Sequence, residues 1–147
     1  MIILGIDPGT NVSGWAMLDT KMNAVVDSGV ADNDQLLYGL NHMPADMMAI
    51  EVFEARGMPI GNDSIETILF TGMLIHAWPH EVQKVRRSQI KLHLCGTARA
   101  KDGNIRQSLI DRFGPPGTKK KPGGTYGVAS HGWAALAAAT VAMDTNV

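Results

Sequence analysis

Two acidic side chains, Asp7 and Glu51, lie at or near the ends of apolar runs that have the length of strands. Residues 2–6 and 47–53 are almost uninterrupted apolar sequences, a pattern typical of central strands buried on both faces. A carboxylate there is costly unless a metal ion, a proton or a partner compensates its charge. If the two strands are neighbours, the pair predicts a site for a hard divalent cation. The alternative is that each acid is only a solvated strand-end residue.

A histidine offers a third, neutral ligand. His131 opens the alanine-rich segment 131–142, which is predicted to be the last helix, and from its first turn the side chain can point to the same cation. Taken alone, a surface histidine at this position is an equally good interpretation. Glu54 follows Glu51 by three residues, which places it on the opposite face of an extended strand, so it is excluded from the site.

A basic segment follows in the second half of the chain. Residues 1–80 contain two basic and ten acidic residues, a net charge of −8, whereas residues 81–147 contain eleven basic and four acidic residues, a net charge of +7. Such asymmetry suits an acidic cation site beside a surface for a polyanion. The alternative is a charged, solvated helix face. The residues predicted to contact DNA phosphates are Lys84, Arg86, Arg87, Lys91, Arg99, Lys101 and Arg106.

Length and composition limit the class of protein. A chain of 147 residues with 45% hydrophobic and 18% charged residues predicts one globular domain, residues 1–147. No apolar run approaches the roughly 18 to 20 residues that span a bilayer, and no signal peptide is recognisable. Cys95 is the single cysteine, which excludes an intrachain disulfide. We expect a cytoplasmic protein that does not contact a membrane.

The order of predicted elements indicates an α/β fold with a mixed sheet. Three sequential strands, at residues 2–6, 13–18 and 24–30, are expected to pair antiparallel, and further strands are expected at 47–53 and 81–85. Helices are predicted at 32–43, 64–78, 88–94, 102–113 and 131–142, and a flexible basic loop at 117–127. The capping residues expected for three of these helices are Asp63, Asp102 and Ser130.

Several of these motifs, in this order, resemble one known family. They are GIDPGT at residues 5–10, SGW at 13–15, AIEVF at 49–53, DS at 63–64, the basic segment 85–112, and SHGWAALA at 130–137. Together they look like the RuvC-type Holliday junction resolvases of the RNase H-like superfamily, and most like the short resolvase-like proteins of bacteriophages. The resemblance implies an RNase H-like fold, with a mixed five-stranded sheet and helices on both faces.

The resemblance also implies an activity, that of a homodimeric endonuclease that cuts branched DNA with Mg²⁺ or Mn²⁺. Asp7, Glu51 and His131 match the family's metal ligands, and we expect a two-ion site that yields 5′-phosphate and 3′-hydroxyl ends. Lys91 and Lys101 match the segment that approaches the scissile backbone, with Lys101 as a further catalytic residue. The helix at 64–78, with its apolar run 68–75, is the expected dimer interface.

Two positions depart from the family pattern. The fourth carboxylate would lie at Ala134, which cannot ligate a metal. Asp144 is too far along the helix to replace it, and Asp102 is better explained as a helix cap. The segment 31–46 is also shorter than in many family members, with no clear consequence.

Two rival interpretations follow. The absence of a carboxylate at Ala134 also fits a non-catalytic or catalytically weakened protein that binds branched DNA. GIDPGT in addition resembles the first phosphate loop of sugar-kinase and actin-like ATPases, but those enclose nucleotide between two domains, and 147 residues are too few.

Overall fold

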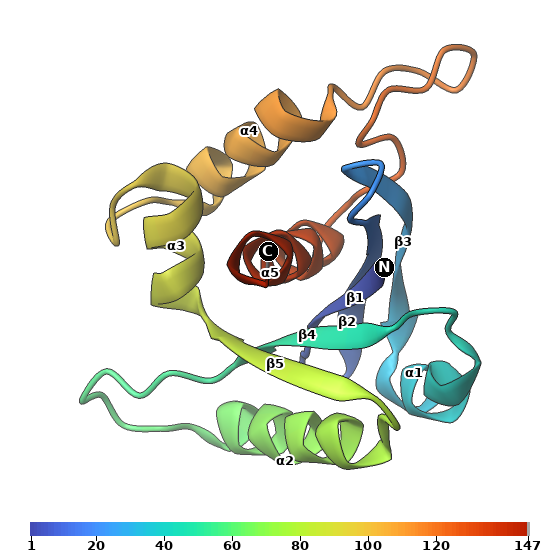
Figure 1. Cartoon of the computed structure of the whole chain (residues 1–147). Coiled ribbons are helices and arrows are strands. Elements are labelled where there is room, and N and C mark those ends of the chain that lie inside the picture. Colours follow the sequence, from blue (N-terminus) through green and yellow to red (C-terminus); the bar gives the residue numbers. More distant parts are fainter. Residues whose placement is uncertain (147) are drawn as a thin grey trace.

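The computed structural model describes residues 1–146 and contains a five-stranded sheet in the order β3-β2-β1-β4-β5 (Figure 1). Strands β1, β2 and β3 pair antiparallel, whereas β4 and β5 run parallel to β1. This confirms the predicted mixed sheet. The strands are β1 Ile2–Asp7, β2 Val12–Asp19, β3 Ala24–Asp32, β4 Met47–Val52 and β5 Glu81–Arg86.

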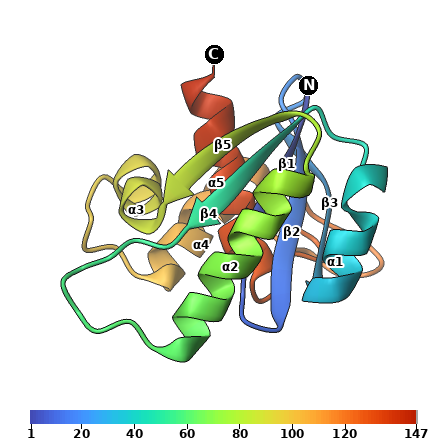
Figure 2. The same cartoon turned by 90° about the horizontal axis from the view of Figure 1, so that it is seen from below.

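Helices cover both faces of the sheet, as predicted (Figures 1 and 2). Helices α3, α4 and α5 lie on one face, and α1 and α2 lie on the other. None of the helices within residues 1–146 is long and apolar enough to cross a membrane. The helices are α1 Asn33–Gly39, followed by the short 3₁₀ turn η1 Leu40–His42, then α2 Asn62–Ala77, α3 Arg87–Cys95, α4 Asp102–Phe113 and α5 Gly132–Thr145.

The central strands explain the uninterrupted apolar runs in the sequence. In β1, Ile3 packs into the core under α5, whereas Leu4 and Ile6 pack into the core under α1 and α2. In β4, Ala49 faces the α5 side and Ile50 the α2 side. All five side chains are fully buried. Since successive strand residues point to opposite faces, both faces must be apolar when helices cover each of them.

Helix α5 packs very closely against the sheet because small residues meet at the contact. Its alanines are almost all buried. A Cβ atom added at Gly5 of β1 would collide with the carbonyl oxygen of Ala135, and one added at Gly14 of β2 would collide with the main chain of His131. Glycine at these two positions therefore allows an approach that a side chain would prevent.

Two helices begin at residues other than those expected. The N-cap of α2 is Gly61, in extended conformation, so the prediction that Asp63 caps this helix is wrong. The N-cap of α5 is His131, and Ser130 before it has φ of 51°, outside the extended region that a capping serine requires. The prediction that Ser130 caps α5 is therefore also wrong.

Helix α4 likewise begins differently. Its N-cap is Lys101, whose backbone N–H donates to Oδ1 of Asn104 at 2.9 Å, and Asp102 is the first helical residue. The side chain of Asp102 is bound by Arg87 instead of capping the helix. The interpretation of Asp102 as a helix cap is thus wrong, because an ion pair outside the helix holds its carboxylate.

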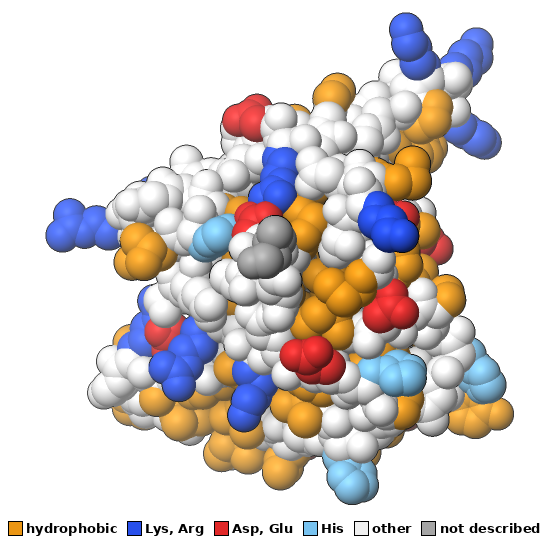
Figure 3. Space-filling model, viewed as in Figure 1, with side chains coloured by type: hydrophobic (Ala, Val, Ile, Leu, Met, Phe, Trp, Pro, Cys, Tyr) orange, Lys and Arg blue, Asp and Glu red, His pale blue; other side chains and the backbone are white. Residues whose placement is uncertain are grey.

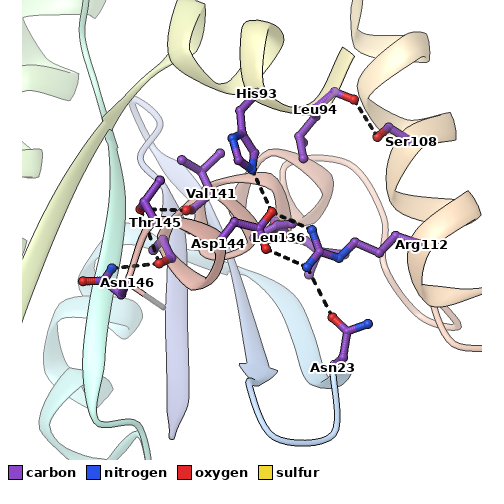
Figure 4. Close-up of polar contacts among 12 residues, drawn as sticks. Asn23, His93, Leu94, Ser108, Arg112, Leu136, Val141, Asp144, Thr145 and Asn146 are labelled. Carbon is purple, nitrogen blue, oxygen red and sulfur yellow. Dashed lines mark hydrogen bonds and ion pairs between the residues drawn. The ribbon is translucent and has the colours of Figure 1, made fainter. Parts of the chain in front are cut away.

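The C-terminal end of α5 is joined to α3 and α4 through Asp144 (Figure 4). Both guanidinium nitrogens of Arg112 donate to this carboxylate at 2.6 Å, and Nε2 of His93 lies 2.7 Å from Oδ2. These contacts, chiefly the hydrogen bonds from Arg112, lower the pKa of Asp144. Asp144 therefore holds α5 against α3 and α4. It lies at the end of α5 remote from His131, which agrees with its exclusion from the candidate metal site.

The basic loop between α4 and α5 ends in a tight turn. Gly117 and Pro122 form an isolated antiparallel bridge, and Thr118 and Lys121 exchange two backbone hydrogen bonds of 3.1 Å. Lysine side chains project from its tip into solvent (Figure 3), and they belong to Lys119, Lys120 and Lys121.

Candidate active site

A pocket of about 680 Å³ lies where the C-terminal ends of β1 and β4 meet the first turns of α4 and α5. It brings together residues that are far apart in the sequence. Its lining contains Asp7, Glu51, Arg87, Asp102, Gly103, Ile105, Arg106, Val128, Ala129, Ser130, His131, Trp133 and Ala134. All three predicted metal ligands, Asp7, Glu51 and His131, are among them.

Strand register places the two carboxylates side by side. Ile6 of β1 pairs with Ile50 of the parallel strand β4. Asp7 directly follows Ile6 and Glu51 directly follows Ile50, so the two acids lie at neighbouring positions of the two strands. Both continue the alternation that points Ile3 and Ala49 toward α5. The two acids thus belong to neighbouring strands, which is the condition on which the sequence-based metal site depended, and both face the same helix.

His131 reaches Asp7 because α5 begins directly against β2. Asp7 pairs with Gly14 across the β1–β2 ladder, and the main chain of His131 lies on that glycine. Nδ1 of His131 lies 2.9 Å from Oδ2 of Asp7. Since an ionised carboxylate only accepts, Nδ1–H is the donor, which leaves Nε2 of a neutral ring as the nitrogen with a free lone pair.

The turn after Asp7 is held by a polar network. The buried hydroxyl of Ser13 accepts from the N–H of Gly9 at 3.1 Å and donates to Oδ1 of Asn33 at 2.7 Å. Nδ2 of Asn33 donates to the carbonyls of Gly9 and Thr10, at 2.9 and 3.1 Å. These contacts fix the chain that leaves β1 and hence the direction of the Asp7 side chain.

Glu51 is the most perturbed acid in the pocket. Burial, together with the nearby Asp7 carboxylate, raises the pKa of Glu51 to about 8, against the opposing effect of Arg87. Its Oε1 atom is buried and lacks a hydrogen-bond partner among residues 1–146, although Nη1 of Arg87 lies 3.5 Å away as an ion pair. Such a group needs a proton or a cation.

Arg87 and Asp102 are pocket residues that the sequence did not reveal as such. Arg87 is one of the residues that the sequence predicts to contact DNA phosphates, but its guanidinium pairs with both Glu51 and Asp102. The pairing of β4 with β5 indicates where Arg87 lies, because Val85 of β5 pairs with Glu51 and packs on the α5 side. The residue two positions later, Arg87, follows on the same side.

The other predicted DNA contacts lie mostly outside the pocket. Arg106 lines it and stacks its guanidinium 4.9 Å from the ring centroid of Trp133. Lys101, the expected catalytic lysine, is exposed at the start of α4 and is not part of the lining. The remaining members are also outside the lining: Lys84, Arg86 and Arg99 are exposed, and Lys91 is half-buried.

Glu54 does not belong to the pocket, as the sequence predicted. Its two oxygens accept from the hydroxyl of Ser88 at 2.6 and 2.7 Å, near the start of α3. This hydrogen bond lowers the pKa of Glu54. It links the segment that follows β4 to the start of α3.

The donor set suits one hard cation. Within residues 1–146, no three His, Cys, Asp or Glu side chains already form a metal cluster. Nevertheless, the buried Oε1 of Glu51 lies near the Asp7 carboxylate, which the imidazole of His131 contacts. Two carboxylates and one imidazole are a set of ligands that Mg²⁺ and Mn²⁺ accept. Ala134 lines the same pocket and adds no ligand.

Comparison with known proteins identifies the fold. No protein-family model and no curated protein sequence matches this chain. Among solved structures, Thermus thermophilus RuvC matches with a TM-score of 0.69 and 18% identity over 99% of this chain and 96% of that chain. The structure of the same protein in complex with a Holliday junction substrate matches with a TM-score of 0.68 and 17% identity, over the same shares of the two chains. The yeast mitochondrial Holliday junction resolvase Ydc2 matches with a TM-score of 0.67 and 9% identity, over 96% of this chain and 78% of that chain. The chain therefore has the fold of RuvC-type Holliday junction resolvases, as its sequence motifs predicted.

Proposed function

We propose that this protein is a divalent-metal-dependent endonuclease that cuts branched DNA, with the four-way junction as its model substrate. The observation that carries the proposal is the convergence of Asp7, Glu51 and His131 on one pocket, where Oε1 of Glu51 is buried without a hydrogen-bond partner among the described residues. The RuvC fold supports it, because similar structures include RuvC bound to a Holliday junction substrate.

Asp7 and Glu51 would hold Mg²⁺ or Mn²⁺, and the imidazole of His131, once released from its hydrogen bond with Asp7, would be the third ligand. The bound metal supplies Lewis acidity, which lowers the pKa of water and stabilises the departing 3′ oxygen. In the hydrolysis, a water oxygen bonds to phosphorus, the bond to the 3′ oxygen breaks, and that oxygen takes up a proton. The products carry 5′-phosphate and 3′-hydroxyl ends.

The basic residues of α3 and α4 would hold the DNA backbone. Lys91 lies on α3, Lys101 is the N-cap of α4, and Arg106 on α4 lines the pocket. Contacts of Lys and Arg with phosphates position DNA without reading its sequence. The substrate preference would then come from the shape of the junction.

Two symmetric cuts require two sites, which a C2 dimer supplies. Helix α2 offers the surface, since Phe70 and Leu74 pack inward while large apolar side chains on the same helix remain exposed. Figure 3 shows such side chains along the lower edge, over α2. The exposed members are Ile65, Ile68, Leu69 and Met73.

A second candidate function is binding of branched DNA without efficient cleavage. Ala134 favours it, because this residue lines the pocket where a further carboxylate would strengthen metal binding. The two functions differ in one observable, the metal-dependent appearance of nicked product.

The test is cleavage of a labelled four-way junction with Mg²⁺ or Mn²⁺, with linear duplex of the same sequence as the DNA control. Asp7→Asn and Glu51→Gln should reduce cutting by at least about a thousandfold while junction binding changes little. His131→Ala should nearly eliminate cutting. Glu54→Gln is the matched acid-to-amide control, because Glu54 lies outside the pocket and a Gln oxygen still accepts from Ser88.

Full activity in Asp7→Asn would contradict the proposed site. Wild-type protein that binds the junction specifically, yet never cuts it with either metal, would instead establish the binding function.

A further inference from the structure

Arg87 bridges two carboxylates inside the pocket. Its Nη1 lies 3.5 Å from Oε1 of Glu51, and its Nη2 contacts Oδ1 of Asp102. The side chain of Arg87 is 26% exposed and that of Glu51 15%, so the first pair is substantially shielded from water. Asp102 is 86% exposed and anchors the guanidinium from the solvent side.

This arrangement puts a fixed positive charge beside the predicted metal ligands. The pocket lining holds three carboxylates, Asp7, Glu51 and Asp102, and two guanidinium groups, Arg87 and Arg106. One divalent ion and the two guanidinium groups would balance these carboxylates and one DNA phosphate. A second divalent ion would leave two uncompensated positive charges.

We propose that the guanidinium of Arg87 takes the place of a second divalent ion, so that each chain binds one metal ion and uses Arg87 to neutralise the scissile phosphate. This inference rests on the proposed nuclease function and revises the two-ion expectation drawn from the sequence.

The ligands support one ion better than two. Ala134 contributes no carboxylate, and Asp102, the remaining acid of the lining, is already paired with Arg87. A second ion near Glu51 would have to displace Arg87 from its contacts with both Glu51 and Asp102. Like charges a few ångströms apart repel strongly in a shielded pocket.

Arginine also has the geometry for this task. A guanidinium carries five N–H donors in a plane and binds phosphate oxygens in a bidentate manner, without a coordination shell of its own. The contacts with Glu51 and Asp102 engage one side each of Nη1 and Nη2. A phosphate that enters the pocket would use the remaining N–H donors of the guanidinium.

The experiment counts bound Mn²⁺ per chain, by calorimetric titration and by electron paramagnetic resonance of free Mn²⁺, without DNA. We expect one ion in the wild type and in Arg87→Lys, which keeps the charge. Arg87→Met should bind the first ion at least about tenfold more tightly, because a nearby positive charge is gone. The double variant Arg87→Met with Ala134→Asp should bind two.

Arg86→Met is the matched control for metal binding. Arg86 pairs with Val52, one residue beyond the Val85–Glu51 pair, and so points to the opposite face of the sheet. Its ion count and affinity should equal those of the wild type, and thermal unfolding of every variant establishes that it is folded.

Two ions in the wild type, or an unchanged affinity in folded Arg87→Met, would overturn the inference. Neither readout depends on cleavage. If no branched DNA is cut, the proposed function fails while the ion counts still decide the role of Arg87.

Discussion

The main chain of His131 lies directly on Gly14, so closely that a Cβ atom at Gly14 would collide with the carbonyl group of His131. Gly14 is also the ladder partner of Asp7. The contact therefore sets the 2.9 Å separation between Nδ1 of His131 and Oδ2 of Asp7. The close packing of α5 on β2 thus determines the geometry of the candidate site.

Gly14→Ala should accordingly disturb both stability and activity. The helix must shift outward or the strand must bend, which we expect to destabilise the protein by roughly 1 to 3 kcal/mol and to reduce cleavage more than junction binding. Gly39→Ala is the control, since Gly39 ends α1 in a helical conformation with nothing within 4 Å of an added Cβ. Its stability should be unchanged or slightly higher. Chemical unfolding measures both, and equal behaviour of the two variants would refute the packing argument.

The pKa of Glu51 predicts how stability depends on pH. The ordinary pKa of this carboxyl group is 4.5, whereas in the folded protein the pKa of Glu51 is about 8. As the pH rises, Glu51 therefore ionises in the unfolded chain before it ionises in the folded protein. Without metal, stability should fall between about pH 5 and 8.5, with a slope of at most about 1.4 kcal/mol per pH unit. Glu51→Gln should abolish this slope. Urea unfolding at several pH values in the presence of a chelator measures it.

Divalent metal should show the opposite trend. Binding to ionised Glu51 displaces its proton, so the stabilisation by Mn²⁺ should increase as the pH rises toward 8. Thermal unfolding with and without Mn²⁺ tests this, and a metal effect independent of pH would show that Glu51 is not a ligand.

The basic residues of α3 and α4 should determine the salt dependence of DNA binding. Replacing Lys91, Lys101 and Arg106 together by alanine should lower the slope of log K against log salt by about 0.9 for each lost phosphate contact. Alanine at residues 119–121 removes the same charge from the exposed loop and should change the slope less. Fluorescence anisotropy over a salt series provides the slopes, and equal slopes in the wild type and the first variant would show a merely solvated surface.

The exposed face of α2 should be the dimer interface. Leu69→Glu places a charge at the centre of the apolar surface and should convert the dimer to a monomer at micromolar concentration. Leu92→Glu is closely matched, because Leu92 on α3 is 60% exposed and Leu69 is 59% exposed. Light scattering reads the mass directly. A wild-type monomer, with or without DNA, would exclude this assembly.

Much of the fold could be predicted because local patterns report burial. The apolar runs of β1 and β4 required helices on both faces, and the alanine-rich segment predicted the closely packed helix α5. Helix starts were predicted less well. Asp63 and Ser130 have residue types typical of caps, but α2 begins two residues earlier, with Gly61 as its N-cap, and Ser130 has a positive φ. Tertiary packing outweighs a capping preference of about 1 kcal/mol.

The sequence by itself identified the two acids Asp7 and Glu51 and the strands that hold them, because strand alternation and apolar runs are local properties. Only the tertiary structure decided how the charges pair. Arg87, the first residue of α3, meets Glu51 of β4 and Asp102 at the start of α4. His131 meets Asp7 across 124 residues of chain. Such pairs depend on how helices pack over the sheet, since a shift of a few ångströms separates an ion pair from two solvated charges.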